Sequence, residues 1–133
     1  MATFNLEIIT PLEVVYRGEA EFVKLRTVVG DMGILAKHAP LVSELALGQM
    51  MIRGEDKKEE SFFVSGGFLE ISKEKTVILA DEAINVKDID AVRAQKEAEE
   101  LKAKIGKMKE EKDLLQAEKT LQENLLKAQL GKR

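Results

Sequence analysis

The spacing of apolar residues changes once along the 133-residue chain, between Ala80 and Ala94. Before this junction, apolar and polar residues alternate in short runs, which is the period of a strand with one buried face. After it, apolar residues recur every three or four positions, which is the period of an amphipathic helix. The pattern predicts a β region followed by a helical region, with 80–94 as their boundary and a candidate hinge.

The first strand is predicted from the alternation of Phe4 to Ile8, and Thr10-Pro11 should end it because proline has no N–H to donate. Residues 14–16 and 20–28 are predicted as two further strands. Arg17-Gly18 is expected to form the turn between them.

Two hairpins are predicted further along, because polar loops at 54–60 and 72–75 each separate two apolar runs. Glycine and proline separate the remaining apolar runs. At least seven short strands in about 84 residues, without helical period, indicate an antiparallel β-sandwich or a flattened barrel.

The helical region is predicted to form two helices joined at 106–112, because Gly106 is unfavourable inside a helix and suits a bend. Asp88 is a candidate N-cap for the first helix, and Asp113 with Gln116 a capping box for the second. One continuous helix through Gly106 is the alternative. Apolar positions form one face of each helix: Ala91, Ala94, Ala98, Leu101, Ile105 and Met108, then Leu114, Ala117, Leu121, Leu125 and Ala128.

Charge and composition exclude several classes of protein. The chain has 21 basic and 24 acidic residues, with a net charge of −4 before Asp88 and a nearly neutral remainder. This is not the basic field of a nucleic-acid-binding protein. There is no cysteine, so disulfides and thiolate metal sites are excluded. No leader or membrane-spanning apolar run is present, so we expect a soluble chain that reaches a membrane only through a partner.

The sequence contains few residues that could form a catalytic or metal-binding site. The only histidine, His38, has no partner for a metal site, and no catalytic motif is present, so no enzyme is predicted. His38 is either an ordinary loop residue or part of an exposed contact loop at 30–41. Gly66-Gly67 is expected to form a tight turn, the alternative being a close approach of two backbones.

Three sequence blocks, in this order, carry a family resemblance. They are Gly30-x-x-Gly33-Ile34-Leu35 with His38-Ala39-Pro40-Leu41, then Val64 to Ile71 (VSGGFLEI), then Ile89 to Ala94 (IDAVRA). Together, on a β region followed by helices, they resemble the epsilon subunit of bacterial F-type ATP synthases over essentially the whole chain.

The resemblance implies a fold and a set of partners. It implies a β-sandwich of about ten strands at 1–84, which binds the gamma subunit and the loops of the c-ring, and a regulatory two-helix hairpin at 85–133. An extended hairpin would reach the alpha and beta subunits of the catalytic head and block ATP hydrolysis. By the same resemblance, Asp31 faces the c-ring loops, and His38 lies in the same loop, facing the ring and gamma. The chain would be peripheral, on the cytoplasmic face of the bacterial inner membrane.

The resemblance also brings an ATP-binding motif, matched here by Asp90 and Arg93. ATP would then be a weak regulatory ligand, and no other cofactor is implied. The chain departs from tight ATP binders at Ile84, where they have an acidic residue, and in the second helix, where lysines replace their arginines. The alternative is that Asp90 and Arg93 simply begin a helix, where an aspartate favours the first turn and an arginine three positions on can pair with it.

The predicted function is therefore a non-catalytic rotor subunit that couples ion flow to ATP synthesis and restrains hydrolysis. The alternatives are an ATP-sensing module and a β-sandwich adaptor with a coiled-coil tail.

Overall fold

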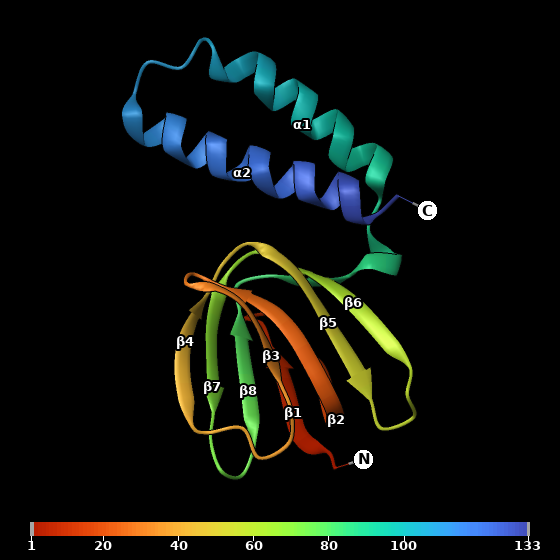
Figure 1. Ribbon diagram of the computed structural model, residues 1–133. Helices are drawn as coiled ribbons and strands as arrows, with labels where there is room; N and C mark the ends of the chain where they lie inside the picture. Colours follow the sequence, from red (N-terminus) through yellow and green to blue (C-terminus); the bar gives the residue numbers. More distant parts are fainter. Residues whose placement is uncertain (1, 133) are drawn as a thin grey trace. The chain divides into compact units, whose positions relative to one another are not determined.

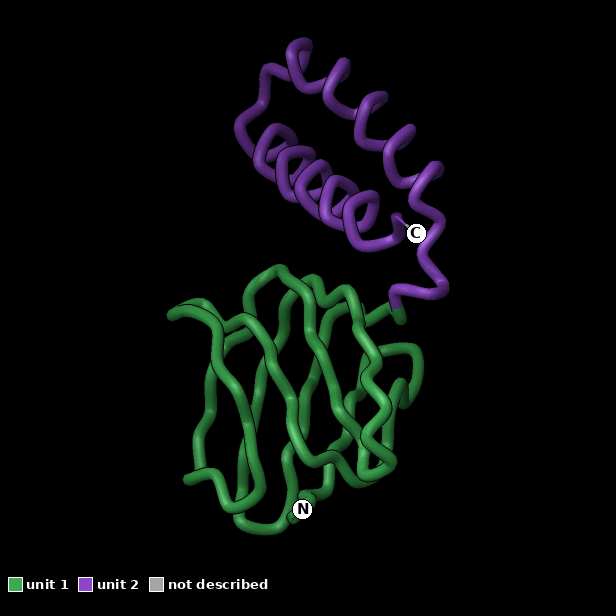
Figure 2. The backbone as a smooth tube through the Cα atoms, turned by 45° about the vertical axis from the view of Figure 1, so that its right-hand side comes forward, with its two compact units in different colours: residues 1–85 green, residues 86–133 purple. Residues whose placement is uncertain are grey.

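The computed structural model describes residues 2–132, and these divide into two compact units at Asn85/Val86. The first unit contains all the strands and the second all the α-helices, as Figure 1 labels them and Figure 2 colours them. The boundary expected from the sequence lies one residue earlier, after residue 84.

The first unit is a β-sandwich of nine strands in the described residues, which confirms the predicted fold class. The chain order of the strands is β1 Phe4–Ile9, β2 Val14–Thr27, β3 Gly30–Ile34, β4 Leu41–Leu45, β5 Gly48–Gly54, β6 Glu59–Val64, β7 Gly67–Ile71, β8 Thr76–Ala80 and β9 Ala83–Asn85. Both predicted hairpins, β5–β6 and β7–β8, are present as antiparallel pairs.

Strand β2 joins the two layers of the sandwich. Its first half pairs with β1, and its second half pairs with β5 on one edge and β3 on the other. In Figure 1 the strands β4, β7 and β8 lie side by side in one layer, with β5 and β6 in the other. The expected turn at Arg17-Gly18 is wrong, because these two residues pair with Glu7 and Leu6 inside a continuous 14-residue strand.

Inward-facing side chains of both layers form the core. They alternate along the strands as a half-buried sheet requires, and the largest of them are less than 2% exposed. Examples are Leu6, Ile8, Ile34, Met50, Ile52, Leu69 and Ile78.

A bulge in β2 places a carboxylate at the edge of this core. Ala20 and Phe22 pair with consecutive residues of β5, so Glu21 is the extra residue between them. Glu21 is buried, and its Oε2 accepts a hydrogen bond of 2.7 Å from Lys57 Nζ. Lys57 lies in the β5–β6 turn with φ of 69°. The ion pair therefore ties this turn to β2.

Gly66 and Gly67 lie where the chain leaves β6 for β7, which are not neighbours in the sheet. Both have a left-handed backbone, with φ of 140° and 133°. A Cβ on Gly67 would lie 2.0 Å from the carbonyl oxygen of Leu79. The expected tight turn at Gly66-Gly67 is not formed, since Gly67 already belongs to β7, and the alternative of a close approach of two backbones is the structure seen.

The second unit is an antiparallel helical hairpin, as predicted, and not one continuous helix. A short 3-10 turn, η1 Val86–Asp88, precedes α1 Ala91–Ile105, and α2 covers Glu111–Leu130. Gly106 ends α1, as expected for the bend. The two helices pack through small side chains, since their buried residues are Ala94, Ala98, Ala117, Asn124 and Ala128.

Both predicted N-caps are wrong. Asp88 belongs to the 3-10 turn, and the N-cap of α1 is Asp90, whose Oδ1 accepts a hydrogen bond of 3.0 Å from the backbone N–H of Arg93. Asp113 lies inside the first turn of α2, which begins two residues earlier after Glu110. The sequence around α1 would allow either Asp88 or Asp90 to be its N-cap. Asp90 takes this position because Asp88 lies in the 3-10 turn before the helix.

Candidate functional site

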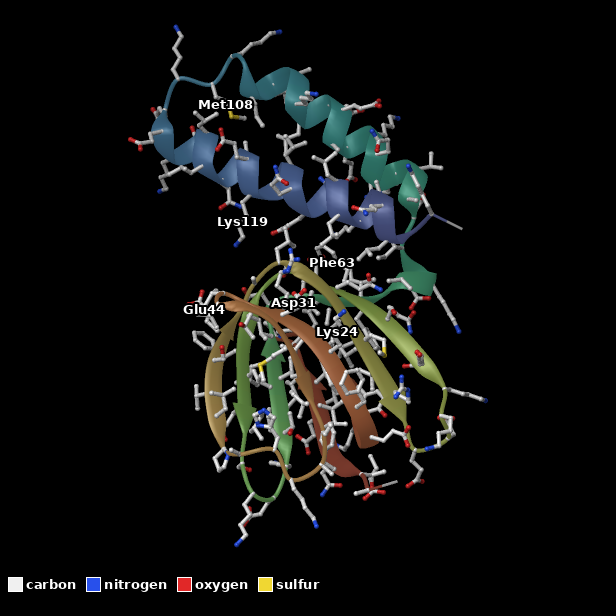
Figure 3. All side chains as sticks on the ribbon, viewed as in Figure 1. Lys24, Asp31, Glu44, Phe63, Met108 and Lys119 are labelled. Atoms are coloured by element: carbon white, nitrogen blue, oxygen red, sulfur yellow. The ribbon has the colours of Figure 1, made fainter. Side chains whose placement is uncertain are left out.

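The two residues expected to contact other subunits, Asp31 and His38, lie at opposite ends of strand β3. Asp31 is the second residue of β3, next to the β2–β3 turn, and Figure 3 shows it toward the same end of the sandwich as Glu44. His38 lies in the loop that follows β3 at the other end. The expectation that both lie in one loop is wrong, because residues 30–34 pair with β2 as a strand.

The end of the sandwich that carries Asp31 is partly apolar. Asp31 pairs with Arg26, with 3.1 Å between Arg26 Nε and Asp31 Oδ1, and both side chains are exposed. Between them along the chain, Val28 and Val29 form the turn and are 55% and 90% exposed. The Thr27 hydroxyl donates to the Gly30 carbonyl oxygen and accepts from the Val29 N–H, which holds the turn in shape.

His38 is held by its own loop. Its backbone N–H donates to the carbonyl of Leu35, and its Nδ1 lies 2.7 Å from the carbonyl oxygen of Ala39. The ring is half-buried. With Nδ1 engaged in this way, Nε2 is the ring nitrogen left for an external partner.

An exposed apolar face lies on the layer formed by β4, β7 and β8. Phe68 pairs directly with Leu79 on β8 and with Glu44 on β4, and Val42 lies two residues before Glu44 on the same face. Val42, Phe68 and Leu79 are 69%, 56% and 52% exposed. We call these three residues the β4–β7–β8 face. Contiguous exposed apolar side chains of this kind mark protein interaction sites.

Sequence reasoning did not find the β4–β7–β8 face. Alternation along a strand shows that one side is buried but does not show whether the other side meets water or a partner. One signal could have revealed it. Phe68 and Leu79 are apolar residues at strand positions that face away from the core, where a solvent-facing strand would carry polar residues.

Asp90 and Arg93 are both engaged within the second unit. Asp90 caps α1, and Arg93 Nε lies 2.9 Å from Glu97 Oε1, an exposed i,i+4 ion pair. Ile84 pairs with Phe63 in the β9–β6 ladder. This geometry is what the start of a helix requires. The ATP-binding role of Asp90 and Arg93 stays a prediction.

The described part of the chain contains neither a cluster of metal ligands nor a membrane-spanning helix. Among residues 2–132, no group of three or more His, Cys, Asp or Glu side chains is placed to hold a metal ion. No helix in the same range is long and apolar enough to cross a membrane.

The fold and these surfaces define a binding subunit: a β-sandwich with an exposed apolar face, joined to a helical hairpin of small buried residues. Comparison with known proteins makes the class specific. Residues 3–86 match the family described as ATP synthase, Delta/Epsilon chain, beta-sandwich domain. The chain is 56% identical over 131 residues to the sodium ion specific ATP synthase epsilon chain of Propionigenium modestum, covering 98% of this chain and 95% of that one.

A second relative and two solved structures agree. The ATP synthase epsilon chain of Shouchella clausii is 40% identical over 132 residues, covering 99% of this chain and 97% of that one. A chain of the Euglena gracilis mitochondrial ATP synthase superposes with a TM-score of 0.79 at 28% identity, covering 91% of this chain and 76% of that one. A chain of the Tetrahymena thermophila enzyme shares the fold, with a TM-score of 0.70 at 14% identity and 98% of each chain covered.

The chain therefore belongs to the epsilon-chain family of bacterial F-type ATP synthases, whose members are non-catalytic subunits of that enzyme. The predicted resemblance and the prediction that the chain is not itself an enzyme are both confirmed.

Proposed function

We propose that this chain is a rotor subunit in the central stalk of an F-type ATP synthase, where it couples ion flow through the c-ring to ATP synthesis and restrains ATP hydrolysis. The observation that carries the proposal is the match to epsilon chains along nearly the whole length, sandwich and hairpin together. The Tetrahymena match comes from a structure described as central stalk and c-ring. In this role the chain is peripheral, on the cytoplasmic face of the bacterial inner membrane.

The β4–β7–β8 face is the surface we assign to the gamma subunit. Its three apolar side chains are exposed although each lies on a well-paired strand, and Glu44 and Glu70 flank them. An apolar centre with a charged rim is the usual anatomy of a protein interface. Substituting Phe68→Glu should abolish binding to gamma, whereas Val92→Glu, at an even more exposed apolar position on α1, should leave it intact.

The Asp31 end of the sandwich is assigned to the c-ring loops. Val28 and Val29 in the β2–β3 turn supply apolar contact, and Asp31 at the start of β3 supplies charge. His38 lies at the other end of β3, and we assign it to the gamma side, since its loop leads directly into β4 and Val42.

The helical hairpin is the regulatory element in this proposal. Its helices hold each other mainly through alanine, which buries little area per turn compared with leucine. A hairpin held so weakly can separate and extend toward the alpha and beta subunits at modest cost. The structure holds both helices in the hairpin form.

The test is removal of residues 88–133. Assembly and ATP synthesis should be largely retained, and ATP hydrolysis by the catalytic head should rise. If hydrolysis is unchanged, the inhibitory role is wrong. If the shortened chain no longer binds gamma, the assignment of gamma binding to the sandwich is wrong.

A further inference from the structure

A pocket of about 600 Å³ opens at the end of the sandwich that carries His38, at the end of β3 away from Asp31. Three segments form most of its lining, namely the N-terminal residues 2–5, the β3–β4 loop and the β7–β8 turn, and Glu19 of β2 completes it. Figure 1 shows these three segments together at one end of the first unit. The volume lies within the range of pockets that hold small molecules.

The floor of this pocket is the open end of the sandwich core. Phe4 and Ile71 line it, and both face inward on their strands. Thr76 lines it too, in register with the core residues of β8, and is only 2% exposed. Its hydroxyl lies in the pocket lining, where it can donate to an occupant.

The mouth of the pocket is cationic although the first unit carries a net negative charge. Lys37 comes from the β3–β4 loop, and Lys73 and Lys75 from the β7–β8 turn. The lining also holds two acidic residues, Glu19 and Glu74, so its three lysines leave one net positive charge. Lys75 makes only a long ion pair of 3.9 Å with Glu7, so its ammonium remains available.

The loop that carries Lys37 has two further unusual features. Lys37 has φ of 66°, a left-handed conformation that is strained for a lysine. Leu35, in the same loop, lines the pocket and is 54% exposed. The loop thus presents an apolar side chain and a cation to the same cavity.

From these observations we propose that the pocket binds a small amphiphilic anion: an apolar body that lies against Phe4, Leu35 and Ile71, with a single acidic group held by Lys37 and Lys73. Charge-assisted hydrogen bonds from ammonium groups to an acid oxygen provide the polar contact. The Thr76 hydroxyl donates to a polar atom of the ligand inside the cavity. A fatty-acid carboxylate has both parts, and a nucleoside monophosphate offers the flat face of its base together with one acidic group. The proposal does not depend on the rotor function.

The test uses the full chain and the fluorescent probe 8-anilinonaphthalene-1-sulfonate, which has an aromatic body and one sulfonate. Saturable binding at one site should be displaced by decanoate or by AMP, and which of the two displaces it identifies the natural source. Inorganic phosphate, which lacks an apolar body, should not displace it. Backbone NMR shifts should change in 35–40 and 71–76.

Variants locate the site. The double substitution Lys37→Glu with Lys73→Glu should weaken probe binding at least tenfold, and Thr76→Val, which keeps the shape, should weaken it about twofold to fivefold. The control double substitution, Lys24→Glu with Lys58→Glu, removes two exposed lysines that lie outside the pocket and should have no effect. Phe68→Ser should also leave binding unchanged, since Phe68 lies on the β4–β7–β8 face and does not line the pocket. Unchanged binding in the Lys37/Lys73 variant, or loss of binding in Phe68→Ser, would overturn the proposal.

Discussion

The two units of this chain are held together by different kinds of buried side chain. The sandwich buries leucine, isoleucine and phenylalanine between layers, and two of its backbone segments approach too closely for any side chain at Gly67. The hairpin buries mostly alanine, and a side chain at Gly106 would meet nothing within 4 Å. The sandwich is thus a single closely packed arrangement, whereas the hairpin has little packing to lose on rearrangement, which suits a fixed binding body and a movable regulatory element.

The largest test of this comparison is one substitution made in both units. Gly67→Ala should cost about 3 kcal/mol or more of stability, since Gly67 has φ of 133° and the new Cβ would meet the Leu79 backbone. Gly106→Ala should be neutral or stabilising by up to about 1 kcal/mol, because Gly106 already has a helical backbone. Urea unfolding followed by circular dichroism measures both. Equal effects would contradict the comparison.

The second test removes the ion pair that ties the β5–β6 turn to β2. Lys57→Ala should cost roughly 2 kcal/mol, because Glu21 is left as a buried carboxylate without its cation. Lys58→Ala is the matched control, since Lys58 is the next residue in the same turn and makes no such pair with Glu21. Thermal unfolding measures both variants. A loss of similar size in Lys58→Ala would mean that turn geometry, rather than the pair, is responsible.

The fold class could be predicted from the sequence because the patterns that indicate it lie within short segments of the chain. The change in apolar period located the boundary between units within a residue or so, and the polar loops at 54–60 and 72–75 identified two hairpins. The continuous strand β2 was not predictable in this way. Gly18 signals a turn locally, but β1 pairs across it, and pairing between distant strands is a tertiary effect.

The candidate site was only partly predictable for the same reason. Asp31 and His38 are seven residues apart, and whether they share a loop or flank a strand depends on pairing with β2. The β4–β7–β8 face combines residues from three strands, and no segment of the chain reveals it alone. The family resemblance identified the kind of protein, while the structure was needed to place its surfaces.

The third test concerns the hairpin and separates a helix cap from a ligand-binding residue. Asp90→Ala should destabilise the hairpin by about 1 kcal/mol, because the Arg93 N–H loses its acceptor. Asp88→Ala should have a smaller effect, since Asp88 lies in the 3-10 turn before the helix. Helix content at 222 nm during thermal unfolding, with and without ATP, is the measurement. Stabilisation by ATP that disappears in Asp90→Ala would favour the ATP-binding role instead.

The smallest expected effect is a dependence on pH that belongs to the sandwich alone. The pKa of Glu55 is raised, first because its carboxyl shares a hydrogen bond with Glu19, and then because the negative charges of Glu19 and Asp56 oppose its ionisation. The folded chain therefore holds this proton to a higher pH than the unfolded chain does. The resulting stabilisation is present below the ordinary glutamate pKa of 4.5 and is lost as the pH rises through the raised pKa.

Glu55→Gln keeps the hydrogen bond to Glu19 without the ionisable proton, so this contribution to the pH dependence should disappear. Between the ordinary and the raised pKa, the unfolding midpoint should fall less steeply with rising pH than in the parent chain. Solvent screens the exposed Glu55 side chain, so the difference should be small and should shrink further at high salt. Glu13→Gln, at an exposed glutamate just before β2, is the matched control and should leave the profile unchanged. A steeper profile in Glu55→Gln would mean that the carboxylate pair favours ionisation in the folded chain, which is the opposite of the effect that the Glu19 hydrogen bond should have.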